Sequence, residues 1–160
     1  MSQFAGEYQY WDKTVETLPR EDLERLQLES LREAVDRALL TPFYRERLGK
    51  AGISSGADLA SLADLSRIPF TTKSDLRDAF PYGMLAAPLE EVVRLHASSG
   101  TTGTPTVIYL DKADLVRWSD YVARCIYATG CTKNDVFQNM ITYGMFTGGL
   151  GFHYGAETVG

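Results

Sequence analysis

Residues 93–110 read VRLHASSGTTGTPTVIYL and divide into three parts. In residues 93–97, apolar side chains alternate with Arg94 and His96, which is the two-residue period of a strand with one buried face. A run of Ser, Thr and Gly follows at 98–106. The last part, residues 107–110, is β-branched and aromatic, as suits a second strand. The stretch therefore predicts two strands that flank a polar loop.

The loop at 98–106 contains six hydroxyl side chains and two glycines. Gly100 and Gly103 allow the backbone to curl so that successive amides point inward as an anion-binding nest, and the hydroxyls add donors at its rim. A polyphosphate would fit such a nest. The spacing differs from that of the Walker loop, and a strand follows rather than a helix, so we expect no contribution from a helix dipole. On composition alone, a hydrophilic hairpin loop explains the run equally well.

Upstream of this stretch, the sequence predicts a long amphipathic helix. Pro19 lies just inside its start, acidic residues occupy its first turn, and apolar residues recur at helical spacing as far as Leu39. The helix should end near Thr41, because a residue that precedes a proline, here Pro42, is pushed out of the helical region.

Shorter helical segments should follow the long helix. One is closed by Gly49, and a brief apolar stripe lies at 59–65. The pair Thr72 and Asp75 is typical of a helix start, and that helix should run to Phe80. The sequence thus predicts a helical lead-in over residues 1–80.

Downstream of the second strand, Asp111 can cap an amphipathic helix that ends at Gly130. Residues 135–140 are expected to form a third strand, and residues 150–159 a further helix. Sheet segments that alternate with helices favour an α/β layer with some parallel strands.

We therefore expect the fold class to be α/β, with the helical lead-in followed at 81–160 by the first strands and helices of a larger domain. A helix that should cross back to a parallel strand has no strand after it before Gly160. The polypeptide is accordingly interpreted as a fragment of a longer protein.

A second unusual run, YGMFTGGLGFHYG, occupies residues 143–155. Bulky aromatic residues alternate there with five glycines, a composition that suits a small pocket for an aromatic or acyl ligand. The alternative is a glycine-rich helix start packed against the sheet, with Phe146 and Phe152 in the core. His153 on its own is more often a hydrogen-bonded packing residue than a catalytic one.

The composition excludes several other classes of protein. The chain has 16 basic and 21 acidic residues, a net charge of -5, which argues against nucleic acid or an anionic membrane as a partner. No signal sequence and no window of about 20 apolar residues occurs, so we expect a cytoplasmic protein. Cys125 and Cys131 do not have the spacing of a zinc site, and with two histidines in the chain no structural metal is expected.

Together the two runs resemble a known family of enzymes. Residues 98–107 resemble the phosphate loop of the AMP-forming acyl and aryl coenzyme A ligases, members of the adenylate-forming superfamily. Residues 143–157 are similar, more specifically, to the phenylacetate-coenzyme A ligase family. Further similar stretches are Tyr44-Arg45, Ile68-Pro69-Phe70-Thr71-Thr72-Lys73, Asp75-Leu76-Arg77 and Val93-Arg94-Leu95-His96-Ala97.

The resemblance implies a reaction in two steps. A carboxylate attacks the α-phosphorus of Mg²⁺-bound ATP to give an acyl adenylate, and the thiol of coenzyme A then displaces AMP to give a thioester. No covalent enzyme nucleophile is implied, and no catalytic residue is assigned. The enzyme has to position two anions and to stabilise charge on the phosphoryl oxygens.

The resemblance also implies roles for individual residues. The phosphates of ATP would be held by Ser98, Ser99, Gly100, Thr101, Thr102, Gly103 and Thr104. The acid would be bound by Tyr143, Phe146, Thr147, Gly148, Gly149 and His153. The substrates are an aryl acid, ATP with Mg²⁺, and coenzyme A, and the helical lead-in offers a surface on which a homodimer could form.

The sequence departs from the family in two respects. Thr104 stands where the family often has lysine, which removes a cation that could steer polyphosphate into the loop. The downstream motifs of the family, including its mobile carboxy-terminal domain, do not occur in these residues, so this piece alone should be inactive. Two alternatives stay open: a related adenylating enzyme for a different acid, and a non-catalytic module that binds a nucleotide or a partner.

Overall fold

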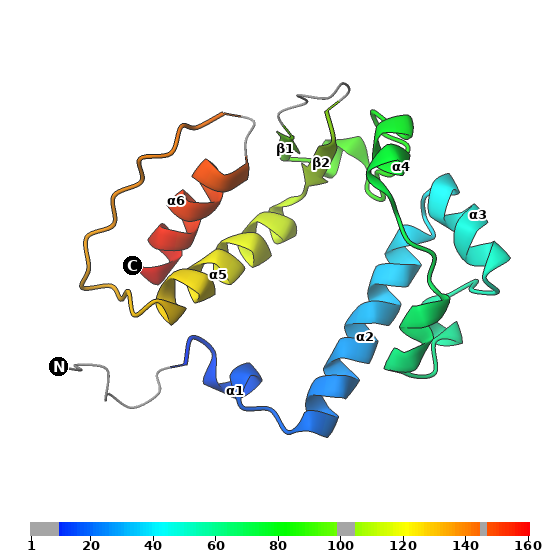
Figure 1. Cartoon of the computed structure of the whole chain (residues 1–160), viewed down its shortest axis with the longest axis horizontal. Helices are drawn as coiled ribbons and strands as arrows, with labels where there is room; N and C mark the ends of the chain where they lie inside the picture. Colours follow the sequence, from blue (N-terminus) through cyan, green and yellow to red (C-terminus); the bar gives the residue numbers. More distant parts are fainter. Residues whose placement is uncertain (1–9, 99–104, 145–146) are drawn as a thin grey trace.

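The computed structural model describes residues 10–98, 105–144 and 147–160. It combines helices with a small sheet, in agreement with the expected mixed architecture (Figure 1). No helix among these residues has both the length and the apolar character that crossing a membrane requires. In chain order, the elements are α1 (Lys13–Glu16), α2 (Arg20–Ala38), α3 (Pro42–Lys50), η1 (Gly56–Asp58), η2 (Leu62–Arg67), α4 (Lys73–Asp78), η3 (Leu89–Glu91), β1 (Arg94–Ala97), β2 (Val107–Leu110), α5 (Lys112–Ala128) and α6 (Thr147–Val159).

The helical lead-in packs around α2. Val35 of this helix forms a buried cluster with Leu48 of α3 and with Ile53 and Leu59 from the turns that follow. The guanidinium group of Arg32 donates hydrogen bonds of 3.0 and 2.7 Å to the carbonyl oxygen of Leu59. The buried apolar surface supplies the stability of this part, and the arginine fixes the turns against α2.

The ends of α2 differ slightly from those expected. Pro19 is the residue before the helix rather than its first residue, and the helix ends at Ala38 instead of near Thr41. Thr41 is 1% exposed, and its hydroxyl accepts a hydrogen bond of 3.3 Å from the amide of Tyr44. It therefore caps α3, and Pro42 begins that helix, a position where the missing amide proton costs nothing.

The predicted helix start at Thr72 is confirmed. Thr72 and Asp75 form a capping box, in which each side chain binds the other's backbone amide. Asp75 also receives a hydrogen bond of 3.0 Å from Arg47 of α3. The helix α4 that they begin ends at Asp78, two residues before Phe80.

The two expected strands form, and they pair with each other as an antiparallel hairpin. Arg94 faces Leu110 and Ala97 faces Val107 across the pair. The expectation of parallel strands is wrong for the described residues, because their one sheet contains these two strands alone. A hairpin loop is sufficient to join antiparallel neighbours, whereas parallel strands would need a long crossover.

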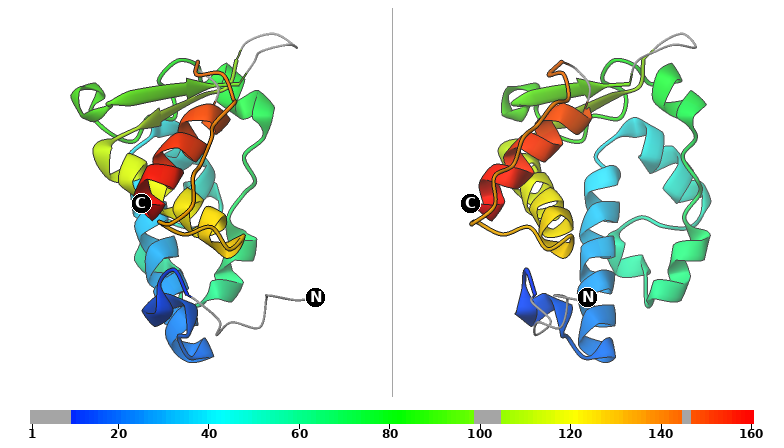
Figure 2. Two further views of the ribbon diagram at one scale, coloured as in Figure 1. Left: turned by 90° about the vertical axis from the view of Figure 1, so that its left-hand side faces the viewer. Right: turned by 60° about the vertical axis from the view of Figure 1, so that its left-hand side comes forward.

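The helices α5 and α6 pack side by side against one face of the hairpin region (Figures 1 and 2). Asp111 caps α5 as predicted, by accepting a hydrogen bond of 2.7 Å from the amide of Asp114. A Cβ atom on Gly151 would lie 2.7 Å from the Trp118 ring, and one on Gly155 would lie 2.5 Å from Val122. These two glycines therefore let the backbone of α6 approach α5 closely. The packing alternative for this run expected contact with the sheet and Phe152 in the core, but the contact is with α5 and Phe152 is 43% exposed.

The third strand expected at residues 135–140 is absent from the described residues. This segment runs along α6 without regular structure (Figure 1). Val136 is 99% exposed and Met140 is 84% exposed. Apolar residues such as Val136, Phe137 and Met140 favour a strand only where a neighbouring strand accepts its backbone hydrogen bonds, and no described strand lies beside this segment.

The short helix α1 was not predicted. Trp11, just before it, donates a hydrogen bond of 2.8 Å from its indole nitrogen to Asp120 of α5. Glu16 forms an ion pair of 3.2 Å with Arg124 of the same helix. The described start of the chain is thus held against α5.

Candidate functional site

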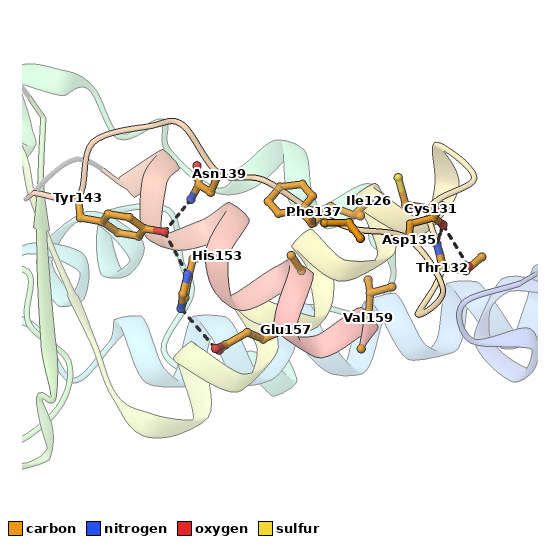
Figure 3. A pocket seen from close by; sticks show the side chains of 13 residues that line it. Ile126, Cys131, Thr132, Asp135, Phe137, Asn139, Tyr143, His153, Glu157 and Val159 are labelled. Carbon is orange, nitrogen blue, oxygen red and sulfur yellow. Dashed lines mark hydrogen bonds and ion pairs between the residues drawn. The ribbon is translucent and has the colours of Figure 1, made fainter.

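A pocket of about 410 Å³ opens between α6 and residues 131–143, which we call the connecting segment (Figure 3). One side is the C-terminal half of α6, and the other is the connecting segment as it returns along that helix. The lining is mixed, because carboxylate, amide, phenol and imidazole groups alternate with apolar side chains. The lining residues are Ile126, Cys131, Thr132, Asp135, Val136, Phe137, Asn139, Tyr143, His153, Ala156, Glu157, Val159 and Gly160.

A chain of polar contacts crosses one wall of this pocket (Figure 3). The side-chain amide of Asn139 donates to the hydroxyl of Tyr143 over 3.1 Å. That hydroxyl lies 3.0 Å from Nδ1 of His153. Nε2 of the same imidazole lies 3.4 Å from Oε1 of Glu157, one turn further along α6. The His153 ring also meets the Tyr143 ring edge to face, with centroids 5.6 Å apart.

The first turn of α6 is held to the connecting segment through backbone atoms. Asn139 donates a hydrogen bond of 2.9 Å to the carbonyl oxygen of Gly149. A Cβ atom on Gly149 would lie 2.8 Å from the carbonyl oxygen of Thr142. The absence of a side chain at Gly149 is therefore what allows the two backbones to approach each other.

The structure brings together part of the acid-binding set expected from the sequence. Tyr143 and His153 share the pocket described above. Gly148 and Gly149 lie in the first turn of α6, and Thr147 begins the helix and lines a different hollow, beside His96 and Trp118. Phe146 lies outside the described residues.

Of the expected phosphate-binding set, Ser98 is described. Its amide donates to the carbonyl oxygen of Thr106, and its hydroxyl oxygen accepts from the amide of Thr106, each over 2.9 Å. The first of these bonds continues the β1–β2 ladder by one residue pair, and the two together close the neck of the loop. Ser99, Gly100, Thr101, Thr102, Gly103 and Thr104 lie outside the described residues.

His96 precedes this neck on β1 and is 3% exposed. Its ring packs edge to face against Trp118 of α5, with centroids 5.0 Å apart. Among the described residues neither ring nitrogen has a hydrogen-bond partner. Burial, together with the charge of Arg94, lowers the pKa of His96 below its usual value of 6.5, so the imidazole is neutral at physiological pH.

Sequence reasoning missed Asn139 as a site residue and gave no role to Glu157. Asn139 stands in the segment expected to be a strand, where alternate side chains would have been assigned to a sheet face. Glu157 follows His153 by four residues, so both lie on the same face of α6. That spacing was the signal that could have identified Glu157.

No family model matches the chain. Individual proteins do match it. Phenylacetate-coenzyme A ligase of Pseudomonas putida is 51% identical over 147 residues, which is 92% of this chain and 32% of that protein. The chain is a relative of the phenylacetate-coenzyme A ligases. The ligases of this name from Thermus thermophilus and Escherichia coli are 50% and 44% identical, each over 91% of this chain and 33% of its own length.

Solved structures of an adenylate-forming ligase also match nearly all of this chain but only part of their own length. A 2-hydroxyisobutyryl-CoA ligase in complex with 2-HIB-AMP superimposes with a TM-score of 0.84 and 28% identity, over 96% of this chain and 33% of that one. The same ligase with 2-HIB-AMP and CoA, in the thioesterification state, gives a TM-score of 0.84 and 30% identity over 94% and 33%. The chain thus spans about a third of the length of the phenylacetate-coenzyme A ligases and of these structures.

Proposed function

We propose that this chain is part of an ATP-dependent, AMP-forming ligase that converts phenylacetate, or a similar aryl acid, to its coenzyme A thioester through an acyl adenylate. The observation that carries the proposal is the 44–51% identity to four phenylacetate-coenzyme A ligases over nearly the whole chain. ATP with Mg²⁺ and coenzyme A would be the other substrates. The 2-hydroxyisobutyryl-CoA ligase structures support this chemistry, because they contain an acyl adenylate and CoA.

The loop between β1 and β2 would hold the β and γ phosphates of ATP through the hydroxyls and amides of residues 98–104. The described neck of the loop supports this role. The hydroxyl oxygen of Ser98 accepts from Thr106, and its own proton is still available to a phosphate oxygen. In the described part of the chain, the buried hydroxyl of Thr106 has no partner. Both groups therefore have unused hydrogen-bonding capacity beside the loop.

The acid would bind between the connecting segment and α6, against Tyr143 and His153. Phe146, Thr147, Gly148 and Gly149 stay predicted members of the acid site, with Thr147 beside a neighbouring hollow. The mixed lining of the pocket supports this assignment, because an aryl acid has one apolar end and one charged end. Nothing in this arrangement requires a covalent intermediate with the enzyme. The contribution of these residues would be orientation of the acid toward the α-phosphorus.

The organisation of the protein around this site is also a proposal. Residues 1–80 would form a helical lead-in, and residues 81–160 would begin the domain that binds ATP and the acid. We propose a cytoplasmic enzyme that binds small molecules rather than nucleic acid or membranes, with the lead-in as the surface for a homodimer.

The direct test is ATP–pyrophosphate exchange by the full-length protein. We expect exchange that depends on phenylacetate, followed by thioester formation when coenzyme A is added. If no aryl acid supports exchange in a correctly folded, ATP-binding preparation, the proposal is wrong.

A second candidate is a ligase of the same mechanism that acts on a different acid. The fold match to a 2-hydroxyisobutyryl-CoA ligase favours it, because that enzyme is named for a short aliphatic acid. Exchange rates over a panel of aryl and alkyl acids distinguish the two candidates. A preference for short hydroxy acids over phenylacetate would favour the second.

A further inference from the structure

All side-chain polar atoms of Asn139 form hydrogen bonds, and one of these bonds links the connecting segment to α6. Nδ2 donates to the hydroxyl of Tyr143 (3.1 Å) and to the carbonyl oxygen of Gly149 (2.9 Å). Oδ1 accepts from the backbone amide of Ile141 (3.1 Å). A carbonyl oxygen can only accept and a backbone amide can only donate, so these two backbone partners fix which end of the Asn139 amide is nitrogen.

This orientation determines the direction of the next hydrogen bond. Because Nδ2 of Asn139 donates, the oxygen of Tyr143 must act as its acceptor. The single hydroxyl proton of Tyr143 is then available for Nδ1 of His153, which lies 3.0 Å away. A neutral imidazole that accepts at Nδ1 carries its proton on Nε2, and that nitrogen faces the carboxylate of Glu157 at 3.4 Å.

We propose that Asn139 is a positioning residue, which directs a hydrogen-bond chain from Asn139 through Tyr143 and His153 toward Glu157. With its proton given to His153, the Tyr143 hydroxyl has none left to donate to a ligand carboxylate. Tyr143 then offers its aromatic ring and oxygen lone pairs to the pocket. This inference rests on the proposed function for one further step: the aryl end of the acid lies against Tyr143, and its carboxylate lies away from it.

The first test measures the proton position directly, without any substrate. In full-length protein labelled with ¹⁵N-histidine, a long-range ¹H–¹⁵N spectrum reports the tautomer of His153, assigned with a His153→Gln variant. We expect the Nε2–H tautomer. In Asn139→Asp, the introduced carboxylate cannot donate, so the Tyr143 proton should turn toward that carboxylate and the His153 tautomer should shift toward Nδ1–H.

The matched control is Asn134→Asp, which introduces the same charge in the same segment. Asn134 is exposed, and its backbone amide donates to Thr132. We expect no change of the His153 tautomer in this variant. If Asn139→Asp does not fold, Tyr143→Phe removes the donor to Nδ1 with little change of shape, and the Nδ1 chemical shift of His153 should change as that hydrogen bond is lost. A wild-type Nδ1–H tautomer, or an unchanged tautomer in the folded variant, overturns the proposal.

The second test distinguishes an effect on binding of the acid from an effect on the whole reaction. In full-length protein, Asn139→Asp should raise the KM for phenylacetate about three- to tenfold and leave the KM for ATP unchanged, as expected when Nδ2 no longer donates to Tyr143 and Gly149. Asn134→Asp should change neither. An equal rise in both KM values would overturn the positioning role. If the tautomer shifts as expected but no ligase activity is found, the proposed function fails while the hydrogen-bond chain stands.

Discussion

Arg37 of α2 and Asp111 at the start of α5 form an ion pair of 2.8 Å, which joins the helical lead-in to the helix behind the hairpin. The same carboxylate caps α5. A hydrogen bond from the Asp114 amide, and then Arg37, hold the pKa of Asp111 below its usual value of 3.8. The folded state therefore binds fewer protons than the unfolded state in acid. The stabilisation is complete above about pH 3.8 and is lost as the pH falls through the lower, folded-state pKa.

Replacing Asp111 with Asn should make stability less sensitive to acid. Asn keeps a capping oxygen but neither titrates nor attracts Arg37, so we expect a small loss of stability at neutral pH. The difference in the free energy of unfolding between wild type and variant should become smaller toward about pH 3. Urea unfolding at the two pH values measures this. If this difference is the same at both pH values, the charge of Asp111 contributes nothing to stability.

Gly155→Ala should destabilise the fold, because the new Cβ would lie 2.5 Å from Val122 Cγ1 and 3.1 Å from the Ala123 amide nitrogen. We expect a loss of about 1–3 kcal/mol from overpacking between α5 and α6. Gly49→Ala in α3 is the matched control, because a Cβ there meets nothing within 4 Å. Its helix propensity should add about 0.5–1 kcal/mol. Thermal unfolding measures the stability of both variants. If both variants changed stability in the same direction and by the same amount, the expected overpacking at Gly155 would be contradicted.

His96→Leu should reduce the loss of stability that the wild type shows in mild acid. Burial and the charge of Arg94 lower the pKa of His96, so the unfolded chain takes up this proton at higher pH than the folded one. The wild type should therefore lose stability as the pH falls below about 6.5, and the variant should lose less. Denaturant midpoints at neutral pH and near pH 5 give the comparison. If the denaturant midpoint falls by the same amount in both proteins between these pH values, the buried, neutral state of His96 is contradicted.

Ser98→Ala should weaken ATP binding if the hairpin loop holds the phosphates. The change removes the hydroxyl that accepts from the Thr106 amide at the neck of the loop. We expect the KM for ATP in the full-length protein to rise about three- to tenfold, with the KM for phenylacetate unchanged. Ser66→Ala, at an exposed serine of η2, should alter neither constant. Unchanged ATP binding in Ser98→Ala would count against the phosphate role of this serine.

Cys131 should report on occupancy of the pocket. Its side chain lines the pocket, whereas Cys125 lies exposed on α5 and outside the pocket lining. If phenylacetate binds there, it should slow alkylation of Cys131 and leave the rate at Cys125 unchanged. Peptide mass spectrometry after timed labelling measures both rates in one sample. Equal protection of the two thiols, or none, would place the acid outside this pocket.

Local sequence signals predicted much of the fold. The capping residues Thr72 and Asp111 each have their partner within three residues, so the helices that they start could be identified without the rest of the chain. The alternation in residues 93–97 likewise predicted β1. Signals of this kind require no knowledge of distant contacts.

Distant contacts explain what the sequence did not predict. The strand expected at residues 135–140 failed because a strand depends on a neighbour that no local pattern specifies. Asn139 could not be identified as a site residue, since its role depends on Gly149, ten residues away along the chain. Trp11 binds Asp120 across more than a hundred residues, and nothing near Trp11 in the sequence indicates that contact.

The glycines of α6 have a consequence for any attempt to reshape the proposed acid pocket. Because Gly151 and Gly155 press bare backbone onto Trp118 and Val122, this helix has no spare volume on its α5 side and acts as a fixed wall of the pocket. Room for a larger or differently shaped acid has to come from the opposite wall. Mutant libraries should therefore concentrate on exposed positions such as Val136 and Phe137, and should leave the helix untouched.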